Sequence, residues 1–493
     1  VLEGAEIGAL GLPIPTIGVA TDGGASVIHG GSGAVYDISS SSTHNDFHKI
    51  FFTDDNRVGV GFESNSTYNI ASYVGLHTIP YADNTGASSS AGWSELYNPT
   101  GYGGLVTTTA AASSTDSAVN AVVPTSEKGL AIGYPVGLAV VKRNTGNNTE
   151  GMVANVTSSY NTGYMLGDIR GAFLMGDRTA DRSVKGNTLT LNQASGSDTV
   201  DAEKVDGASG TADLYGYKSF SADNYLSKAS DTDFDFGTGD FSMMFWFKTS
   251  DVSDVENYVA RMDASLNAGD WTLLKSSTVM QFYRYGSSWV KQVGTATGSV
   301  VANAWTQCVV LRRGTKYEIY LNGKLSDDGS PQSNNDTLDN SGVLSIGHAL
   351  GNAGPADTSS LSLVRLSATA PTPQQVKEIY EAEAPLFRAG AKCLLSGADA
   401  IEDLSYDSST DLLTTAGNQN NIFRGLERVD TFNGQTHSDW NSTSSHFVAS
   451  NGGVSSYVRA YGTGGVIIDL PAIDVRGDIN TADTKLPDDG KFH

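Results

Sequence analysis

Aromatic side chains gather in the short segment Tyr283–Trp289, which reads YRYGSSW. If this segment begins as a β-strand, Tyr283 and Tyr285 share one face and lie opposite the apolar Phe282, because side chains alternate along a strand. Flat aromatic side chains that face away from a core can stack on sugar rings. We therefore predict that Tyr283, Tyr285 and Trp289 bind glycan. The alternative is that they cover a sheet against a neighbouring domain.

The loop Gly347–Thr358 (GHALGNAGPADT) carries the other candidate ligand-binding side chains. The amide of Asn352 can bond to sugar hydroxyls, and the carboxylate of Asp357 is the kind of oxygen ligand that Ca²⁺ prefers. We predict Asn352 as a further glycan contact and Asp357 as a calcium ligand. Calcium is the one cofactor that the sequence suggests.

Strong catalytic motifs are absent from the sequence. It contains no G-x-S-x-G nucleophile elbow, no H-E-x-x-H helix, no P-loop and no S-x-D-x-G-x-T-W box. The two carboxylates of a glycosidase need only come within roughly 5 to 10 Å of each other in space, which a sequence does not reveal. We predict that the protein is not an enzyme, with a polysaccharide depolymerase as an alternative.

The strands that would position these residues have alternating patterns. One face of a strand is fully apolar in the stretch DFSMMFWFK, where it carries Phe241, Met243, Phe245 and Phe247. Trp246 lies on the other face, which predicts that this face is also covered or binds a partner. Further on, Asn322-Gly323 separates two apolar runs and is the strongest short hairpin signal. Two packed antiparallel sheets are the expected result.

A short helix is predicted after the last of these strands. Thr372 has the side chain of an N-cap, Pro373 follows at the first helical position, and Gln375 lies three residues after the cap. Val376 and Ile379 then fall on one face of the helix.

Four sequence elements occur in a fixed order: DFSMMFWFK, AWTQCVVLRRGTKYEIYLNGKL, GVLSIGHA and LSLVRLSATAPTPQQVKEIYEAE. In this order they resemble the laminin G-like (LamG, concanavalin A-like) jelly-roll family over about residues 211–383. The resemblance implies two antiparallel sheets that bind glycans or protein surfaces, often with calcium. Many relatives carry an acidic residue before the last strand, whereas this chain has Leu361–Arg365 (LSLVR), which argues against the family's calcium site there.

Hairpin-like patterns recur outside the central region. Each has an apolar run, a turn rich in Gly, Asn or Asp, and a second apolar run. They begin at residues 19, 51, 131, 164, 412 and 447, so adjacent copies start 32 to 35 residues apart. Regular spacing is typical of propellers and solenoids. We favour a propeller; the alternative is unrelated hairpins in a generic sandwich.

The central region interrupts these hairpins. We therefore predict an all-β protein in which a LamG-like two-sheet jelly-roll sandwich is inserted into a β-propeller-like scaffold. The predicted domains are residues 1–200 for the first part of the repeats, 201–384 for the sandwich, 385–478 for the second part of the repeats, and 479–493 for a polar tail or linker.

Composition argues against several classes of partner. The chain has 31 Lys and Arg against 54 Asp and Glu, a net charge of −23, so nucleic acid is not an expected partner. No apolar run approaches the roughly 18 residues that span a bilayer, so membrane insertion is not expected. The two cysteines, Cys308 and Cys393, fall in different predicted domains, which favours free thiols and a reducing compartment.

The arrangement as a whole resembles structural appendage proteins of tailed bacteriophages, such as tail fibres. The resemblance rests on hairpin repeats interrupted by a LamG-like module. It implies a virion protein, assembled in the host cytoplasm, that binds other virion proteins and host-surface polysaccharide, and that forms a homo-oligomer, with a trimer favoured. A secreted or cell-surface bacterial adhesin is the alternative.

Overall fold

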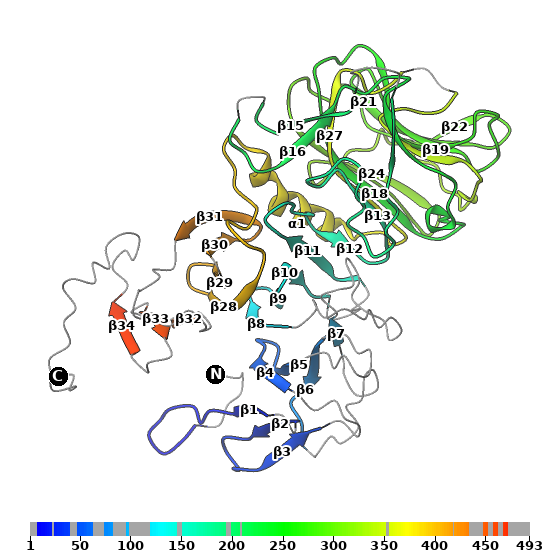
Figure 1. Cartoon of the computed structure of the whole chain (residues 1–493). Helices are drawn as coiled ribbons and strands as arrows, with labels where there is room; N and C mark the ends of the chain where they lie inside the picture. Colours follow the sequence, from blue (N-terminus) through cyan, green and yellow to red (C-terminus); the bar gives the residue numbers. More distant parts are fainter. Residues whose placement is uncertain are drawn as a thin grey trace.

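The chain is all-β in the computed structural model, as predicted, and the strands among its described residues form seven antiparallel sheets (Figure 1). Within the described residues, no helix is long and apolar enough to cross a bilayer. The structure describes residues 7–21, 24–39, 47–62, 73–81, 95–97, 119–144, 150–193, 199–207, 210–351, 354–417, 419–432, 447–451, 457–461 and 467–471.

Two of the sheets pack face to face as a sandwich, which confirms that part of the predicted fold. The first sheet has eight strands, ordered β15 (Asp201–Lys204), β16 (Tyr215–Lys218), β27 (Ser359–Ser367), β18 (Phe241–Thr249), β23 (Thr306–Arg313), β24 (Lys316–Leu321) and β25 (Lys324–Leu325), with β13 (Ile169–Phe173) also paired to β27. The second has seven, ordered β14 (Thr190–Asn192), β17 (Tyr225–Lys228), β26 (Val343–Ile346), β19 (Val255–Met262), β20 (Trp271–Ser276), β21 (Val279–Tyr285) and β22 (Trp289–Gly294).

Large apolar side chains fill the space between the two sheets. Phe241, Phe245 and Phe247 of β18, which were predicted to share a face, are fully buried there. From the opposite sheet, Phe282 approaches Phe241 with 5.7 Å between ring centroids, and Trp271, on the same sheet as Phe282, lies 6.1 Å from Phe282. The alternating pattern of β18 therefore identified the inner face of the sandwich correctly.

The other face of β18 is covered by protein. Trp246 stacks on Phe387 with 4.1 Å between centroids, where Phe387 ends the 3₁₀ helix Ala384–Phe387. Trp246 also stacks on Tyr380 of α1 (Pro373–Glu383) at 5.8 Å. We predicted that the large residues of this face are either covered or bind a partner. The structure shows that α1 and the 3₁₀ helix cover Trp246.

Helix α1 begins at the predicted cap. The Thr372 hydroxyl accepts the backbone N–H of Gln375 at 3.2 Å, and the Gln375 side chain accepts the N–H of Thr372 at 2.9 Å. Val376 and Ile379 are fully buried in a cluster with the outer side chains of the eight-stranded sheet. The capping box and the apolar face of the helix are both confirmed.

The sandwich recruits strands that precede residue 201, the predicted start of its domain. β13 pairs with β27, placing Ile169 beside Ser367, and β14 pairs with β17. Residues 169–192 therefore complete both sheets instead of belonging to the repeats. These strands are short and find partners far along the chain, so no local pattern marks them as part of the sandwich.

The other five sheets are small. Their strands are β1 (Ile17–Thr21), β2 (Gly24–Ile28) and β3 (Val35–Ile38); β4 (Phe47–Phe52), β5 (Arg57–Phe62), β6 (Tyr73–Thr78) and β7 (Glu95–Tyr97); β8 (Ala121–Thr125), β9 (Gly129–Tyr134), β10 (Gly137–Lys142), β11 (Met152–Val156) and β12 (Met165–Leu166); β28 (Ile401–Asp407), β29 (Leu412–Gly417), β30 (Asn420–Arg424) and β31 (Glu427–Phe432); and β32 (Phe447–Asn451), β33 (Tyr457–Tyr461) and β34 (Ile467–Pro471).

The prediction of a propeller is wrong for the residues that the structure describes. Five predicted hairpins are present, formed by β1-β2, β4-β5, β9-β10, β29-β30 and β32-β33. In the remaining one, β12 pairs with β11 and β13 pairs with β27, so the two strands do not form a hairpin. The hairpins belong to sheets of three to five strands, and within the described residues these sheets do not form a ring of blades around one axis, so the regular spacing reflects similar hairpin lengths.

A sheet that precedes the sandwich in the sequence packs against a sheet that follows it. β28 lies against β8 and β9, and the Asn120 side-chain amide donates to the Ile401 carbonyl at 2.8 Å. Gly133 leaves room for the Ile401 side chain, which a Cβ at residue 133 would overlap. The chain thus returns, after the sandwich, to the sheets that precede it (Figure 1). The predicted tail at residues 479–493 lies outside the described residues.

Candidate functional site

The structure brings Tyr285 and Trp289 together at the edge of the seven-stranded sheet. They are cross-strand partners on β21 and β22, and their rings meet edge to face, with 5.3 Å between centroids and 69° between planes. Both side chains are half-buried. Edge-to-face pairs of this kind fix the orientation of both rings.

Tyr283 lies two residues before Tyr285 on β21 and therefore on the same outer face. Met280 and Phe282, on the opposite face, are fully buried in the sandwich core, as predicted. We call Tyr283, Tyr285 and Trp289 the aromatic platform. Two of its members are cross-strand partners, and the third follows from strand alternation.

The platform is supported from one side. Trp289 packs against a small apolar cluster on the outer face, built on Ala260 and Met262 of β19 and on Ala349 of the loop after β26. Leu266, from the loop between β19 and β20, packs on the same cluster. Two loops therefore hold Trp289, and the rest of its side chain faces outward.

The loop that was predicted to supply ligands starts beside the platform and ends beside an acidic cluster. Asn352, the predicted glycan contact, lies outside the described residues. Asp357 is exposed, and its carboxylate lies with those of Asp254 and Glu256, with one oxygen of each within 4.8 Å of the others. Sequence reasoning missed Asp254 and Glu256, because nothing local links β19 to a loop a hundred residues later.

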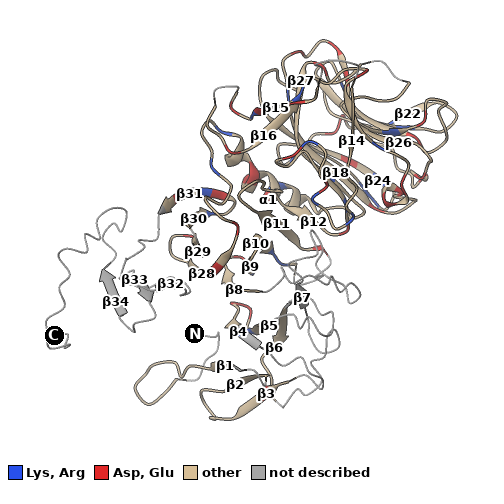
Figure 2. Ribbon diagram, in the orientation of Figure 1, with Lys and Arg blue, Asp and Glu red and all other residues tan. Residues whose placement is uncertain are grey.

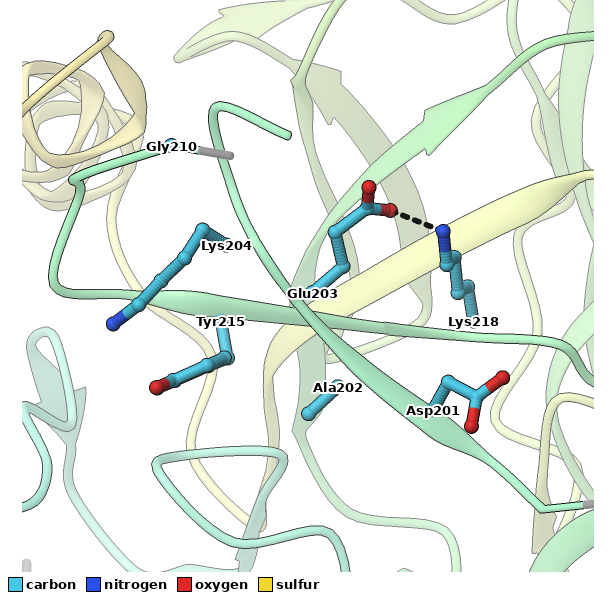
Figure 3. Close-up of a pocket in the computed structure, with 7 residues that line it drawn as sticks. All are labelled: Asp201, Ala202, Glu203, Lys204, Gly210, Tyr215 and Lys218. Carbon is cyan, nitrogen blue, oxygen red and sulfur yellow. Dashed lines mark ion pairs between the residues drawn. The ribbon is translucent and has the colours of Figure 1, made fainter. Parts of the chain in front are cut away.

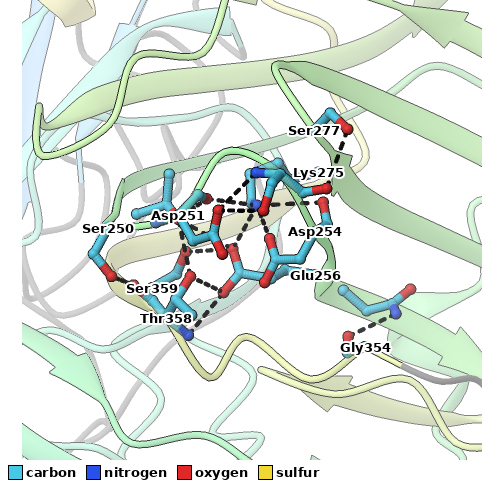
Figure 4. Close-up of polar contacts among 12 residues, drawn as sticks. Ser250, Asp251, Asp254, Glu256, Lys275, Ser277, Gly354, Thr358 and Ser359 are labelled. Carbon is cyan, nitrogen blue, oxygen red and sulfur yellow. Dashed lines mark hydrogen bonds and ion pairs between the residues drawn. The ribbon is translucent and has the colours of Figure 1, made fainter.

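Glu256 is fully buried and is the centre of the acidic cluster (Figure 4). One carboxylate oxygen accepts the Thr358 N–H at 2.9 Å and the Thr358 hydroxyl at 3.0 Å. The other accepts the hydroxyls of Ser359 at 2.8 Å and Tyr258 at 3.2 Å. Burial and the charge of Glu256 raise the pKa of Tyr258 well above its usual value, so this phenol remains a donor.

Lys275 of β20 lies in the same cluster, and its side chain is fully buried (Figure 4). Its ammonium contacts the Asp254 carboxylate, lies 3.2 Å from a carboxylate oxygen of Glu256, and donates to the Asp251 carbonyl at 2.8 Å. These contacts use the three N–H donors of the ammonium. A positive charge is therefore already present among the carboxylates.

The cluster fits calcium poorly. A carboxylate has about four lone-pair positions, and those of Glu256 already receive two hydroxyls, a hydroxyl–amide pair from Thr358 and the Lys275 ammonium. A calcium ion needs six to eight oxygens at roughly 2.3 to 2.6 Å and would have to share this space with a like charge. Asp357 therefore lies in the acidic cluster, as its carboxylate position shows, but the cation in that cluster is the Lys275 ammonium.

A separate hollow lies along β15 and β16, at the edge of the eight-stranded sheet (Figure 3). Its charged side chains are matched internally: Lys218 lies 2.5 Å from Glu203, and Lys204 Nζ lies 3.8 Å from the ring centroid of Tyr215 and donates to a backbone carbonyl. Asp201 accepts a serine hydroxyl at 2.8 Å. Because these groups have partners, this hollow is a weaker candidate than the aromatic platform.

Charged side chains of both signs are interspersed over the sandwich (Figure 2). On the platform side, Lys291 of β22 pairs with Asp328 at 2.5 Å, whereas Arg284, on the opposite face of β21, pairs with Asp336 at 3.1 Å. The surface beside the platform therefore combines aromatic rings with paired charges. Such a surface suits a polar, uncharged or weakly charged ligand better than a phosphate backbone.

Residues 220–377 match a family model described as the Concanavalin A-like lectin/glucanases superfamily, Laminin_G_3. This match confirms the predicted LamG-like domain. No curated protein matches the sequence.

Solved structures show distant likeness. The binding domain of Paraclostridial Mosquitocidal Protein 1 aligns with 14% identity and a TM-score of 0.35, covering 61% of this chain and 77% of that one. The binding domain of botulinum neurotoxin DC, in complex with SialylT, aligns with 11% identity and a TM-score of 0.33, covering 61% and 73%. Domain 4 of AbnA, a GH43 extracellular arabinanase from Geobacillus stearothermophilus, in complex with arabinotriose, aligns with 13% identity and a TM-score of 0.29, covering 43% and 98%. All three TM-scores lie below 0.5, so these structures say nothing about the ligand of this chain.

Proposed function

We propose that the sandwich is the glycan-binding module of an adhesion protein and that the aromatic platform is its ligand-binding surface. The observation that carries the proposal is the Tyr285–Trp289 pair, held edge to face on the outer side of a sheet whose inner side is already filled. The match to a lectin superfamily over residues 220–377 supports the same class of ligand.

The placement of the platform argues against a purely structural role. The rest of the chain packs on the outer face of the eight-stranded sheet, where Trp246 and Val309 share a cluster with α1 and with β9 and β10. β19 and β22 lie on the side of the sandwich away from that contact (Figure 1). Among the described residues, the apolar cluster that holds the platform contains side chains of β19, β22 and the two adjoining loops.

A sugar would find complementary groups at this surface. The flat rings of Tyr285 and Trp289 match the C–H face of a pyranose, and Tyr283 lies beside them on the same face. Gln281, also on the outer face of β21, has an amide that can donate to and accept from sugar hydroxyls. Lys291 lies across from Tyr283 on β22 and adds a further donor.

The test is a glycan array with the full chain, followed by affinity measurements on the best ligand. Trp289→Ala is expected to weaken binding by roughly tenfold or more, because it removes one ring and the support of the other. Tyr81→Ala is the matched control, because Tyr81 is an aromatic side chain that is 78% exposed and far along the chain from the sandwich. Unchanged affinity in both Trp289→Ala and Tyr285→Ala would overturn the proposal.

The finer proposal is that the protein is a virion appendage, and that the module contacts host-surface polysaccharide. Its support is the arrangement of a binding module carried at one end of a series of small sheets (Figure 1). A stable homo-oligomer in light scattering, with a trimer favoured, is the expected result, whereas a monomer would favour a secreted adhesin. Absence of catalysis remains a prediction, and release of reducing ends from a bound polysaccharide would replace it with a depolymerase.

A further inference from the structure

We infer that the ammonium of Lys275 is a built-in cation, which takes the place that a calcium ion would have in the Asp254–Glu256–Asp357 cluster and so makes the sandwich independent of calcium. The consequence for ligand binding rests on the proposed function; the inference about the cation does not.

The oxygens around Lys275 are those that a hard cation would select. They are two carboxylates, from Asp254 and Glu256, and two backbone carbonyls, from Asp251 at 2.8 Å and Asp254 at 3.5 Å. Carboxylate and carbonyl oxygens are the usual ligands of Ca²⁺. Here a single lysine side chain that is 0% exposed brings the positive charge to them covalently.

The charge is needed because the cluster brings like charges together. Oxygens of three carboxylates lie within 4.8 Å of one another, and Glu256 is fully buried. Without a cation, a buried carboxylate beside two others is strongly unfavourable. Lys275 supplies one positive charge, and hydroxyl and amide donors from Thr358 and Ser359 complete the shell of Glu256.

This arrangement positions the loop that follows β26. Its end is fixed by Glu256, which accepts both donors of Thr358, and by Asn257, whose backbone and side-chain amides donate to the Gly354 carbonyl at 2.8 and 2.9 Å. Its beginning packs on Trp289 through Ala349. Lys275 is thus a positioning residue that acts through Glu256 on a loop bordering the aromatic platform.

The first experiment compares the thermal unfolding of the full native chain with EDTA and with roughly 5 mM CaCl₂. The Tm is expected to be the same in both solutions. In titration calorimetry, the native chain and Asp357→Asn are expected to give the same result, because no calcium binds at Asp357. A Tm that falls in EDTA, or calcium binding that disappears in Asp357→Asn, would overturn the inference.

The second experiment uses two variants of the lysine. Lys275→Ala removes the charge and leaves space, so its Tm should fall by roughly 10 °C without calcium and recover in part when calcium is added. Lys275→Met removes the charge but fills the space, so its Tm should fall and calcium should not restore it. If Lys275→Ala folds and its Tm does not rise when calcium is added, the inference is contradicted.

Two controls separate the causes. Lys316→Ala removes an exposed lysine that lies 3.1 Å from Glu318 on the other sheet, and it should neither lower the Tm appreciably nor create a calcium response. Glycan binding by the native chain should be equal with and without EDTA. If no glycan binds while the calcium results hold, the proposed function fails and the inference about Lys275 stands.

Discussion

The carboxylate of Glu383, the last residue of α1, lies against the guanidinium of Arg365 on β27, with 3.0 Å between Oε2 and Nη2. Both side chains are fully buried. The same carboxylate accepts the indole N–H of Trp246 at 2.7 Å and the backbone N–H of Tyr164 at 3.0 Å. One ion pair therefore connects the sandwich, its helix and the chain that precedes the sandwich.

Glu383→Gln should lower the free energy of unfolding by about 3 kcal/mol, because it leaves a buried guanidinium without its counter-charge. Urea unfolding followed by tryptophan fluorescence measures this. Glu427→Gln is the control: its partner Arg388 has a side chain that is 63% exposed, so the loss should stay under about 1 kcal/mol. Equal effects of the two changes would contradict the proposed difference between buried and exposed pairs.

His348 should make the loop after β26 sensitive to acid. Burial lowers the pKa of His348 below its ordinary value of 6.5, so the folded state resists protonation more than the unfolded state does. Its contribution to stability is complete above 6.5 and is lost as the pH falls below 6.5 and through the lowered pKa of the folded state. Tm measured from pH 8 to pH 5 should fall less in His348→Gln than in the native chain; parallel curves would count against this prediction.

Two variants of Tyr285 distinguish ring stacking from hydrogen bonding in the proposed glycan site. Tyr285→Phe keeps the ring that meets Trp289, so glycan affinity should fall by less than about threefold, whereas Tyr285→Ala should lose roughly tenfold. Surface plasmon resonance on the ligand from the array gives both values. Equal losses in the two variants would assign the role to the hydroxyl.

Gly347 is the first residue of the loop after β26 and has φ +83. A Cβ at this position would overlap the ring of Phe220. Gly347→Ala should therefore lower the free energy of unfolding by about 2 kcal/mol or more, from backbone strain and overlap together. Gly351→Ala is the matched control, since Gly351 also has positive φ but its added Cβ would make only ordinary contacts from 3.4 Å. A similar loss in both would mean that backbone strain alone decides the cost.

The sequence predicted the parts of the fold that depend on local patterns. Alternation along β18 identified the inner face that carries Phe245, and alternation along β21 placed Tyr283 and Tyr285 on the outer face. The capping box of α1 was visible in the spacing of Thr372 and Gln375. Each of these features involves residues within a few positions of one another.

The parts that were missed depend on contacts between distant segments. Lys275 and Glu256 meet on adjacent strands, but Asp357 reaches them from a loop that no local pattern links to β19. β13 falls in the hairpin-like pattern that begins at residue 164, and β14 falls in the predicted repeat domain outside any hairpin, but their partners are β27 and β17. The propeller was inferred from regular spacing, which similar hairpins in separate sheets reproduce without any common axis.

The contact between Asn120 and Ile401, whose positions differ by 281 residues, also sets an order of events during synthesis. The sheet β8–β12 leaves the ribosome long before β28. Until β28 is made, the part of this sheet that β28 covers therefore stays exposed to solvent. The sandwich, including α1, is complete before β28 is made, and domains generally fold as they emerge. The sandwich is therefore expected to fold before β28 is made and to hold the sheet β8–β12 in place until β28 packs against it.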